Sequence, residues 1–334
     1  MKYLKYKLKY IKLKRKQKGG NISNLINTIY NNLIYNNFYD NINIQYCKGQ
    51  IASDPTIDIP TKCKNRFDEI KSYKSINGFN FFVSPCRIGR ESKFCSQRVQ
   101  NCLLTKNAIS CPICNISDRT EVNPCRQLNN IIITELDDMF ILLPNAYPYL
   151  EKQFLITTKN HILQIDLLDN IEILSNLINI FVETLDDNSV IFFNGICGNS
   201  LEHFHCQYTT SKFPIFDQLQ KDFTGFYQNN LFRGYVCIIP NKDVKEIFDL
   251  IQKIKMHNLT YNFITRKISE LNLQIIFFIR FCHVNKNVKD LNFGATELSG
   301  VIVSNKELSY SDTDITNYLD STNRISDYEK FSDS

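Results

Sequence analysis

The stretch that decides the fold prediction is NGICGNSLEHFHCQYTT, residues 194–210. Its second part alternates polar and apolar side chains with the period of two that is typical of a β-strand, whose successive side chains point to opposite faces. One face would carry the polar members His203, His205, Gln207 and Thr209, and the other the apolar members Phe204, Cys206 and Tyr208. Two histidines at i and i+2 offer little apolar packing, so the pattern favours chemistry over a solvated surface pair.

Strand-length apolar runs precede this motif. The runs NIIITEL (130–136), MFILL (139–143) and QFLITT (153–158) are separated by acidic or Asn-Pro turn signals and predict an antiparallel meander. Apolar residues at helical spacing then predict an amphipathic helix over residues 165–184, before the strand SVIFFNG. An earlier helix is expected over 22–36 and a short strand over 79–83. The element order indicates an α+β fold of antiparallel sheets with packed helices.

The chain downstream of the motif has a similar pattern of short strands and a helix. Strands are expected at YVCII (235–239), TYNFIT (260–265), LQIIFFIRF (273–281) and within GATELSGVIV (294–303), together with one helix. The pattern predicts that this region is a second, degenerate copy of the first unit. The predicted organisation is a basic tail, an N-terminal cover segment, a catalytic half, a second half and an acidic polar tail, at residues 1–20, 21–75, 76–210, 211–310 and 311–334.

Charge is distributed unevenly along the 334 residues. The net charge is +5, but residues 1–18 hold eight lysines and Arg15 without one acid, so the remainder of the chain is net negative. Broad nucleic-acid binding is therefore not indicated for the body. The basic tail is expected to be a solvated extension that could contact an acidic surface; a targeting arm and a membrane-surface helix are the alternatives.

Cysteine usage and hydropathy bear on the compartment. Nothing at the start resembles a secretory signal, and a chain of this length does not need disulfides, so the twelve cysteines are expected to be reduced thiols. No run approaches the ~18 apolar residues that a membrane-spanning helix needs. The sequence predicts an intracellular, most simply cytoplasmic, protein without a membrane span.

The segment NGICGNSLEHFHCQ, residues 194–207, resembles the active-site motif of the histidine-triad superfamily. It is similar to the transferase branch, which contains galactose-1-phosphate uridylyltransferase, diadenosine tetraphosphate phosphorylase and GDP-hexose phosphorylases. That branch has a glutamine at the position of Gln207, as this chain does, whereas the hydrolases more often have a third histidine there. The resemblance extends over residues 79–303 and implies nucleotidyl transfer rather than hydrolysis.

The resemblance implies a ping-pong mechanism with catalytic residues His205, Gln207 and Ser200. A neutral imidazole is a good nucleophile near physiological pH, so His205 would take a nucleoside monophosphate from a nucleotide sugar or a dinucleoside polyphosphate and pass it to a phosphate-bearing acceptor. Ser200, Gln207 and loop amides suit the charge that builds on the phosphate oxygens. Nucleotide contacts are expected from Asn145, Asn194, Gly195, Gly198, Asn199 and Arg87.

The pair Cys111 and Cys114 has the Cys-x-x-Cys spacing that lets two thiolates bind one zinc ion. The uridylyltransferase branch completes such a site with an intervening histidine and the first histidine of the His-x-His pair, which implies His161 and His203 here. The zinc would be structural. Cys125 could replace either histidine, and two small buried cysteines are the alternative interpretation.

Other functions remain open at this point. The chain could be a non-catalytic, zinc-stabilised binding or structural protein of the same fold, or a nucleotide hydrolase. Glu202, in the loop before His203, could repel a phosphate unless it points away. No readable motif separates guanine, adenine and uracil, or identifies the acceptor, and a homodimer is one assembly that the sequence allows.

Overall fold

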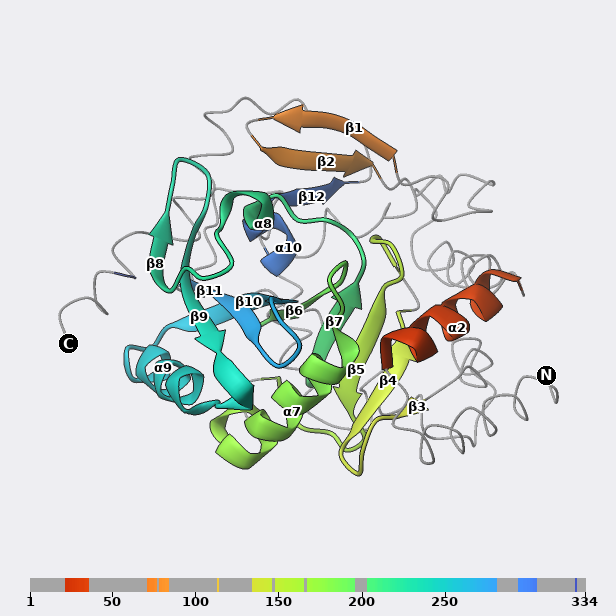
Figure 1. The fold of residues 1–334 in the computed structure, drawn as a ribbon, viewed down its shortest axis with the longest axis horizontal. Helices are drawn as coiled ribbons and strands as arrows, with labels where there is room; N and C mark the ends of the chain where they lie inside the picture. The colour runs from red at the N-terminus through yellow and green to blue at the C-terminus, as the bar shows by residue number, and fades with distance from the viewer. Residues whose placement is uncertain are drawn as a thin grey trace, which may run out of the picture.

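The computed structural model describes residues 22–35, 71–76, 78–83, 113, 134–145, 148–164, 167–195, 203–280, 294–304 and 328 (Figure 1). These residues form helices packed on a large antiparallel sheet, so the predicted α+β class is confirmed. Among the helices described here, none is long and apolar enough to cross a membrane.

The large sheet has nine strands in the order β3-β4-β5-β7-β6-β10-β11-β9-β8, and every neighbouring pair is antiparallel. The expected meander is confirmed for β3, β4 and β5, although only the end of the run 130–136 is described. The strand bounds are β3 (Thr134–Glu135), β4 (Phe140–Pro144), β5 (Phe154–Thr158), β6 (Val190–Asn194), β7 (His205–Thr209), β8 (Gly225–Gln228), β9 (Arg233–Ile239), β10 (Thr260–Lys267) and β11 (Leu273–Arg280).

One connectivity occurs twice in this sheet. Two strands, a helix and two strands follow one another as β4-β5-α7-β6-β7 and again as β8-β9-α9-β10-β11. In both groups the last strand lies between the second and the third strand, and the groups meet where β6 pairs with β10. That the second group is a degenerate copy of the first, and the domain bounds given above, remain predictions.

Helices α2 (Ile22–Tyr35), α7 (Ile171–Thr184) and α9 (Lys245–Met256) contribute to the hydrophobic core on one face of the large sheet. The helix expected over 165–184 begins later than predicted, because Asn170 caps it by accepting hydrogen bonds from the backbone N–H groups of Glu172 and Ile173. A separate short turn, η4 (Leu167–Asp169), precedes it, and η5 (Pro240–Lys242) precedes α9.

A second core lies on the opposite face of the large sheet. It is covered by a small sheet of order β1-β2-β12 and by two short helices, seen at the top of Figure 1. Their bounds are β1 (Lys71–Ile76), β2 (Phe79–Val83), β12 (Val301–Ser304), α8 (Ile215–Gln218) and α10 (Ala295–Leu298). Within the segment 294–303, one helical turn, α10, precedes the expected strand, which is β12.

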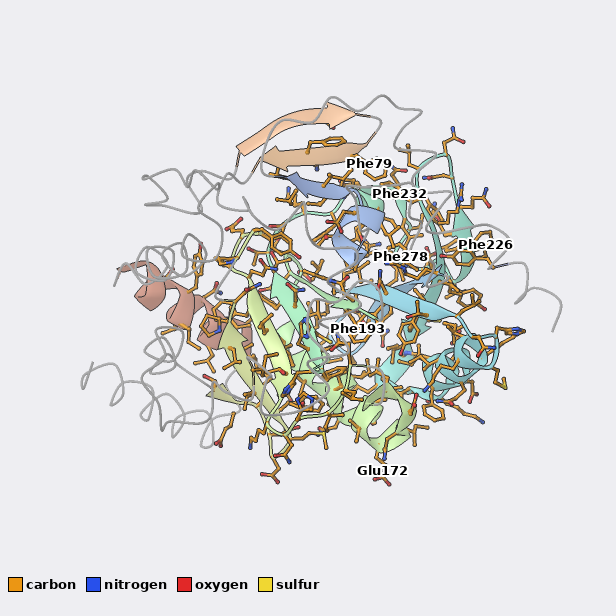
Figure 2. All side chains as sticks on the ribbon, turned by 180° about the vertical axis from the view of Figure 1, so that it is seen from behind. Phe79, Glu172, Phe193, Phe226, Phe232 and Phe278 are labelled. Carbon is orange, nitrogen blue, oxygen red and sulfur yellow. The ribbon has the colours of Figure 1, made fainter. Side chains whose placement is uncertain are left out.

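Large aromatic side chains fill both cores (Figure 2). Phe193 stacks on Phe263 across the β6–β10 pair with ring centroids 5.0 Å apart, and Phe79 of the small sheet packs 5.2 Å from Phe232. Each such side chain contributes about 1.5–3 kcal/mol when it is fully buried. The two cores hold the strands between them in fixed register, which positions the ends of β5, β6 and β7.

Candidate functional site

Strand β7 divides its side chains between the two faces of the large sheet. Phe204, just before the strand, and Cys206 and Tyr208 within it lie in the core shared with α7. His205 and Gln207 alternate with them and therefore lie on the opposite face. They are 5% and 9% exposed, so both polar side chains are largely withdrawn from water.

The ring of His205 is held in one tautomer. Its Nδ1 lies 2.8 Å from the backbone carbonyl oxygen of His203. A carbonyl only accepts, so Nδ1 carries the hydrogen and Nε2 carries the lone pair. Burial lowers the pKa of His205, against the smaller raising effect of that hydrogen bond. The ring is therefore neutral at physiological pH, with Nε2 as its nucleophilic atom.

Gln164 fixes the backbone of His205. Its Oε1 accepts from the His205 N–H at 2.8 Å, and its Nε2 donates to the carbonyl oxygens of His205 and Asn194 at 3.0 and 2.9 Å. Gln164 is fully buried, and it ties the start of β7 to the end of β6. The sequence reasoning missed this residue; the available signal was a glutamine within the otherwise apolar stretch HILQI.

The amide of Gln207 is also fixed by a second glutamine. Its Oε1 accepts a hydrogen bond of 2.5 Å from Nε2 of Gln153, the residue just before β5. Gln153 is fully buried and was not singled out from the sequence. The predicted substrate residue Asn145 lies beside it, because the Asn145 N–H donates to the Gln153 carbonyl at 3.0 Å.

Asn194 and Gly195 form a tightly held corner where β6 ends. The Gly195 N–H donates to Oδ1 of Asn262 at 2.9 Å, and Oδ1 of Asn194 accepts from the N–H of Ala295 at 2.7 Å. A Cβ at Gly195 would stand 2.1 Å from the Tyr261 carbonyl oxygen. Glycine is needed here for close backbone approach. The corner fixes the end of β6, immediately before residues 196–202 in the sequence.

The remaining expected site residues fall outside the part of the chain that the structure describes. These are Ser200, Gly198, Asn199, Arg87, Cys111 and Cys114, together with the alternative ligand Cys125. Their predicted roles rest on the sequence.

The two expected histidine ligands lie together. The rings of His161 and His203 meet edge to face with centroids 5.1 Å apart. Nε2 of His203 lies 2.9 Å from the Thr158 carbonyl oxygen and 3.0 Å from Thr158 Oγ1. Because that hydroxyl donates its own hydrogen to the Asn160 carbonyl, both oxygens accept from Nε2–H, and the lone pair is on Nδ1.

The electrostatics of His203 suit a metal ligand. Burial lowers its pKa to about 4; the Thr158 backbone bond opposes the shift, and the neighbouring His161 and His205 add to it. Metal-binding histidines are neutral and commonly donate their other N–H to a carbonyl, as His203 does. Within the described ranges, no group of three or more His, Cys, Asp or Glu side chains gathers as a metal site. The two histidines of the expected Cys2His2 set thus lie side by side, and the set itself remains a prediction.

No protein-family model matches the chain, and no curated protein matches its sequence. Among solved structures, yeast Ap4A phosphorylase Apa2 is similar at 16% identity, over 76% of this chain and 86% of that one, with a TM-score of 0.48. The structure of the same yeast protein in complex with Ap4A is 15% identical, over 82% of this chain and 93% of that one, with a TM-score of 0.49. A DUF4931 family protein from Bacillus cereus is 17% identical, over 56% of this chain and 97% of that one, with a TM-score of 0.33.

The neighbours have low identity and TM-scores below 0.5, so the resemblance to the histidine-triad superfamily rests on the motif at residues 194–207. The similarity is one of fold at low identity. The proposed reaction therefore rests on the geometry of the residues described above, and the proposed substrate class rests on the resemblance of the motif.

Proposed function

We propose that the chain is a nucleotidyl transferase or phosphorylase that works through a nucleotidyl-histidine intermediate on His205. The observation that supports this most directly is the fixed tautomer of His205, whose Nδ1–H donates to the His203 carbonyl and leaves the lone pair on Nε2. A nucleophile needs one defined nitrogen that carries a lone pair and no proton, and this hydrogen bond makes Nε2 that atom.

In the first half-reaction, Nε2 attacks the α-phosphorus of the donor. A P–N bond forms, the P–O bond to the phosphorylated leaving group breaks, and that group departs with the bonding electron pair. In the second half-reaction, an oxygen of a phosphate-bearing acceptor attacks the same phosphorus and the P–N electrons return to Nε2. Burial favours the first half-reaction because it lowers the pKa of His205 and so keeps Nε2 unprotonated before it attacks.

Negative charge builds on the non-bridging oxygens during both transfers. Gln207 lies two residues beyond His205 on the same face of β7 and has amide hydrogens to donate. Ser200 and the backbone amides of the loop 196–202 would add further donors, and the corner at Gly195 fixes where that loop starts. Neutral donors of this kind contribute several kcal/mol to the stability of such a transition state.

The donor substrate would be a nucleotide sugar or a dinucleoside polyphosphate, the substrate classes of the branch that the motif resembles. Gln207 in place of a third histidine favours transfer to a phosphate acceptor over hydrolysis. Asn145, Asn194, Gly198, Asn199 and Arg87 remain proposed nucleotide contacts.

A zinc ion held by Cys111, Cys114, His161 and His203 fits this scheme as a structural element. The metal would supply a cross-link with four protein ligands and no open coordination position. The hydrogen bond from His203 to Thr158 uses Nε2, so Nδ1 is the atom that would coordinate the metal. In this scheme His203, whose ring contacts that of His161, would bind the metal, and His205, whose ring donates to the His203 carbonyl, would be the nucleophile.

The test is labelling of the protein by a panel of donors that carry ³²P at the α-phosphate, namely nucleotide sugars and dinucleoside polyphosphates. We expect an acid-labile, base-stable adduct in the wild type and none in His205→Ala. A matched control is His257→Ala, since His257 lies at the C-terminal end of α9 and should leave labelling intact. No adduct with any donor would overturn the proposal, and labelled His205→Ala would overturn the choice of nucleophile.

The same experiment separates the alternatives. Adduct that is discharged by water as fast as by added phosphate or sugar phosphate would identify a hydrolase. A protein that binds nucleotide but forms no adduct would be a binding protein of this fold.

A further inference from the structure

The side-chain amide of Gln153 can have only one orientation. Its Oε1 lies 2.8 Å from the backbone nitrogen of Tyr149 and 3.3 Å from that of Leu150. Backbone N–H groups only donate, so the atom that faces them must be the oxygen. The Nε2 hydrogens of Gln153 are thereby directed away from this turn and toward Gln207.

This orientation is passed on to Gln207. Nε2 of Gln153 lies 2.5 Å from the side-chain oxygen of Gln207, and a donor on Gln153 requires an acceptor there. The amide of Gln207 therefore uses its oxygen toward Gln153, and its two Nε2 hydrogens are the part that Gln153 does not hold. Gln153 is fully buried, whereas Gln207 is 9% exposed on the face of β7 that carries His205.

The turn that carries Gln153 is tied to β7 at several points. The Glu151 carbonyl accepts from Thr209 Oγ1 at 2.6 Å and from the Thr210 N–H at 3.2 Å, and the Glu151 N–H donates to Ser211 Oγ at 2.9 Å. Lys152 adds a hydrogen bond from Nζ to Asn27 of α2. The distance between Gln153 and Gln207 is thus set by the framework and does not depend on their own contact alone.

We propose that Gln153 is a positioning residue that makes Gln207 present its amide hydrogens, and not its oxygen, to the substrate phosphate. This rests on the proposed function, in which Gln207 faces the non-bridging oxygens. An amide turned by 180° would set an acceptor against an anionic oxygen, whereas the observed orientation sets two donors there. Gln153 thus determines whether Gln207 attracts or repels the phosphate oxygens, although Gln153 itself does not contact the substrate.

The decisive variant is Gln153→Glu, which preserves the shape and the acceptor for Tyr149 and Leu150 but removes the hydrogens. The ionised carboxylate can only accept, so Gln207 then donates to it and turns its oxygen to the phosphate. We expect adduct formation on His205 to slow by about 100-fold, as for loss of one oxyanion donor, with a smaller change in the donor concentration at half-maximal rate.

A double-mutant cycle distinguishes positioning from general damage. If Gln153 acts through Gln207, then Gln153→Glu should cost little more rate in a chain that already carries Gln207→Ala. Multiplicative losses from the two substitutions would overturn the proposal. The matched control is Gln274→Glu, which places the same change at another fully buried glutamine, on β11, and should lower thermal stability without slowing the adduct.

A second readout needs no substrate. Hydrogen exchange of ¹⁵N-labelled glutamine side chains measures which amide donates in the buried bond. We expect Gln153 hydrogens to be protected in the wild type, and Gln207 hydrogens to become protected in Gln153→Glu. Unchanged Gln207 exchange would overturn the inference even in an active enzyme. Lack of any adduct in the wild type would overturn the proposed function and leave the exchange result to decide this one.

Discussion

Nδ1 of His205 donates to the backbone carbonyl oxygen of His203 across 2.8 Å, so the two histidines of the His-x-His pair are joined at the start of β7. The contact fixes the tautomer of His205, while His203 turns its own ring toward Thr158 and His161. A shift of His203 would therefore move the acceptor that sets the nucleophilic nitrogen of His205. The predictions below probe the groups that hold this arrangement.

Gln164→Met should slow labelling of His205 by about 10-fold to 100-fold. It removes three buried hydrogen bonds, to the N–H and carbonyl of His205 and the carbonyl of Asn194, and leaves those groups without their partner. The free energy of unfolding should fall by about 2–4 kcal/mol. Gln274→Met, at an equally buried glutamine of β11, should lose comparable stability in urea unfolding but keep its labelling rate. Equal labelling by wild type and Gln164→Met would contradict the role given to Gln164.

Gly195→Ala should impair both stability and adduct formation. The new methyl group would stand 2.1 Å from the Tyr261 carbonyl oxygen, so the corner must shift and weaken the Gly195 bond to Asn262. We expect a loss of about 2–4 kcal/mol in the free energy of unfolding. The comparison is Gly225→Ala, where nothing lies within 4 Å of the added atom and only the positive φ of +96° opposes it. A Gly195→Ala protein that melts above Gly225→Ala would refute the packing argument.

Metal analysis should find about one zinc ion per chain in the wild type, as a four-ligand structural site requires. Cys111→Ser and His161→Ala should each lower the zinc content and the melting temperature. Cys237→Ala changes a buried free cysteine of β9 that is no part of the proposed set, so it should retain the metal. Zinc-free wild-type protein would rule out the site, and full zinc content in Cys111→Ser would exclude that residue as a ligand.

Asp186 should stabilise the protein in a pH-dependent way. Desolvation by itself raises its pKa, but hydrogen bonds from Ser23, Ser189 and the Asn188 N–H, with the charge of Lys152, lower the pKa below 3.8 overall. A lowered folded-state pKa gives stability that is present above the unfolded value and lost as the pH falls through the folded value. Asp186→Asn should thus be less stable than wild type at pH 7, and the difference should shrink below pH 3.8.

Urea unfolding of wild type and Asp186→Asn, at pH 7 and at a pH below 3.8, measures this difference in the free energy of unfolding. If the stability difference between wild type and Asp186→Asn grew as the pH was lowered, the predicted direction of the pH dependence would be wrong. Because Ser23 lies on α2, Ser23→Ala should reproduce part of the effect at pH 7 and loosen that helix.

Elements with strong local patterns were predictable from the sequence. The strands at 139–143, 153–158 and 235–239 and the helix at 22–36 agree with β4, β5, β9 and α2. The start of α7 was predicted too early, because the apolar spacing continues through the η4 turn. Only the Asn170 cap marks where the helix begins. The helical turn of α10 was missed, since four residues are too few for a periodic signal.

The sequence by itself determined which side chains of residues 203–209 share a face, because alternation along a strand is a local property of the extended backbone. It also assigned the histidines their expected roles by resemblance. Only the tertiary structure decided that β5 and β6 flank β7, that Gln164 clamps His205 and that Gln153 orients Gln207. Those contacts join residues 41 and 54 positions apart. They depend on register and on hydrogen-bond polarity, which no local pattern carries.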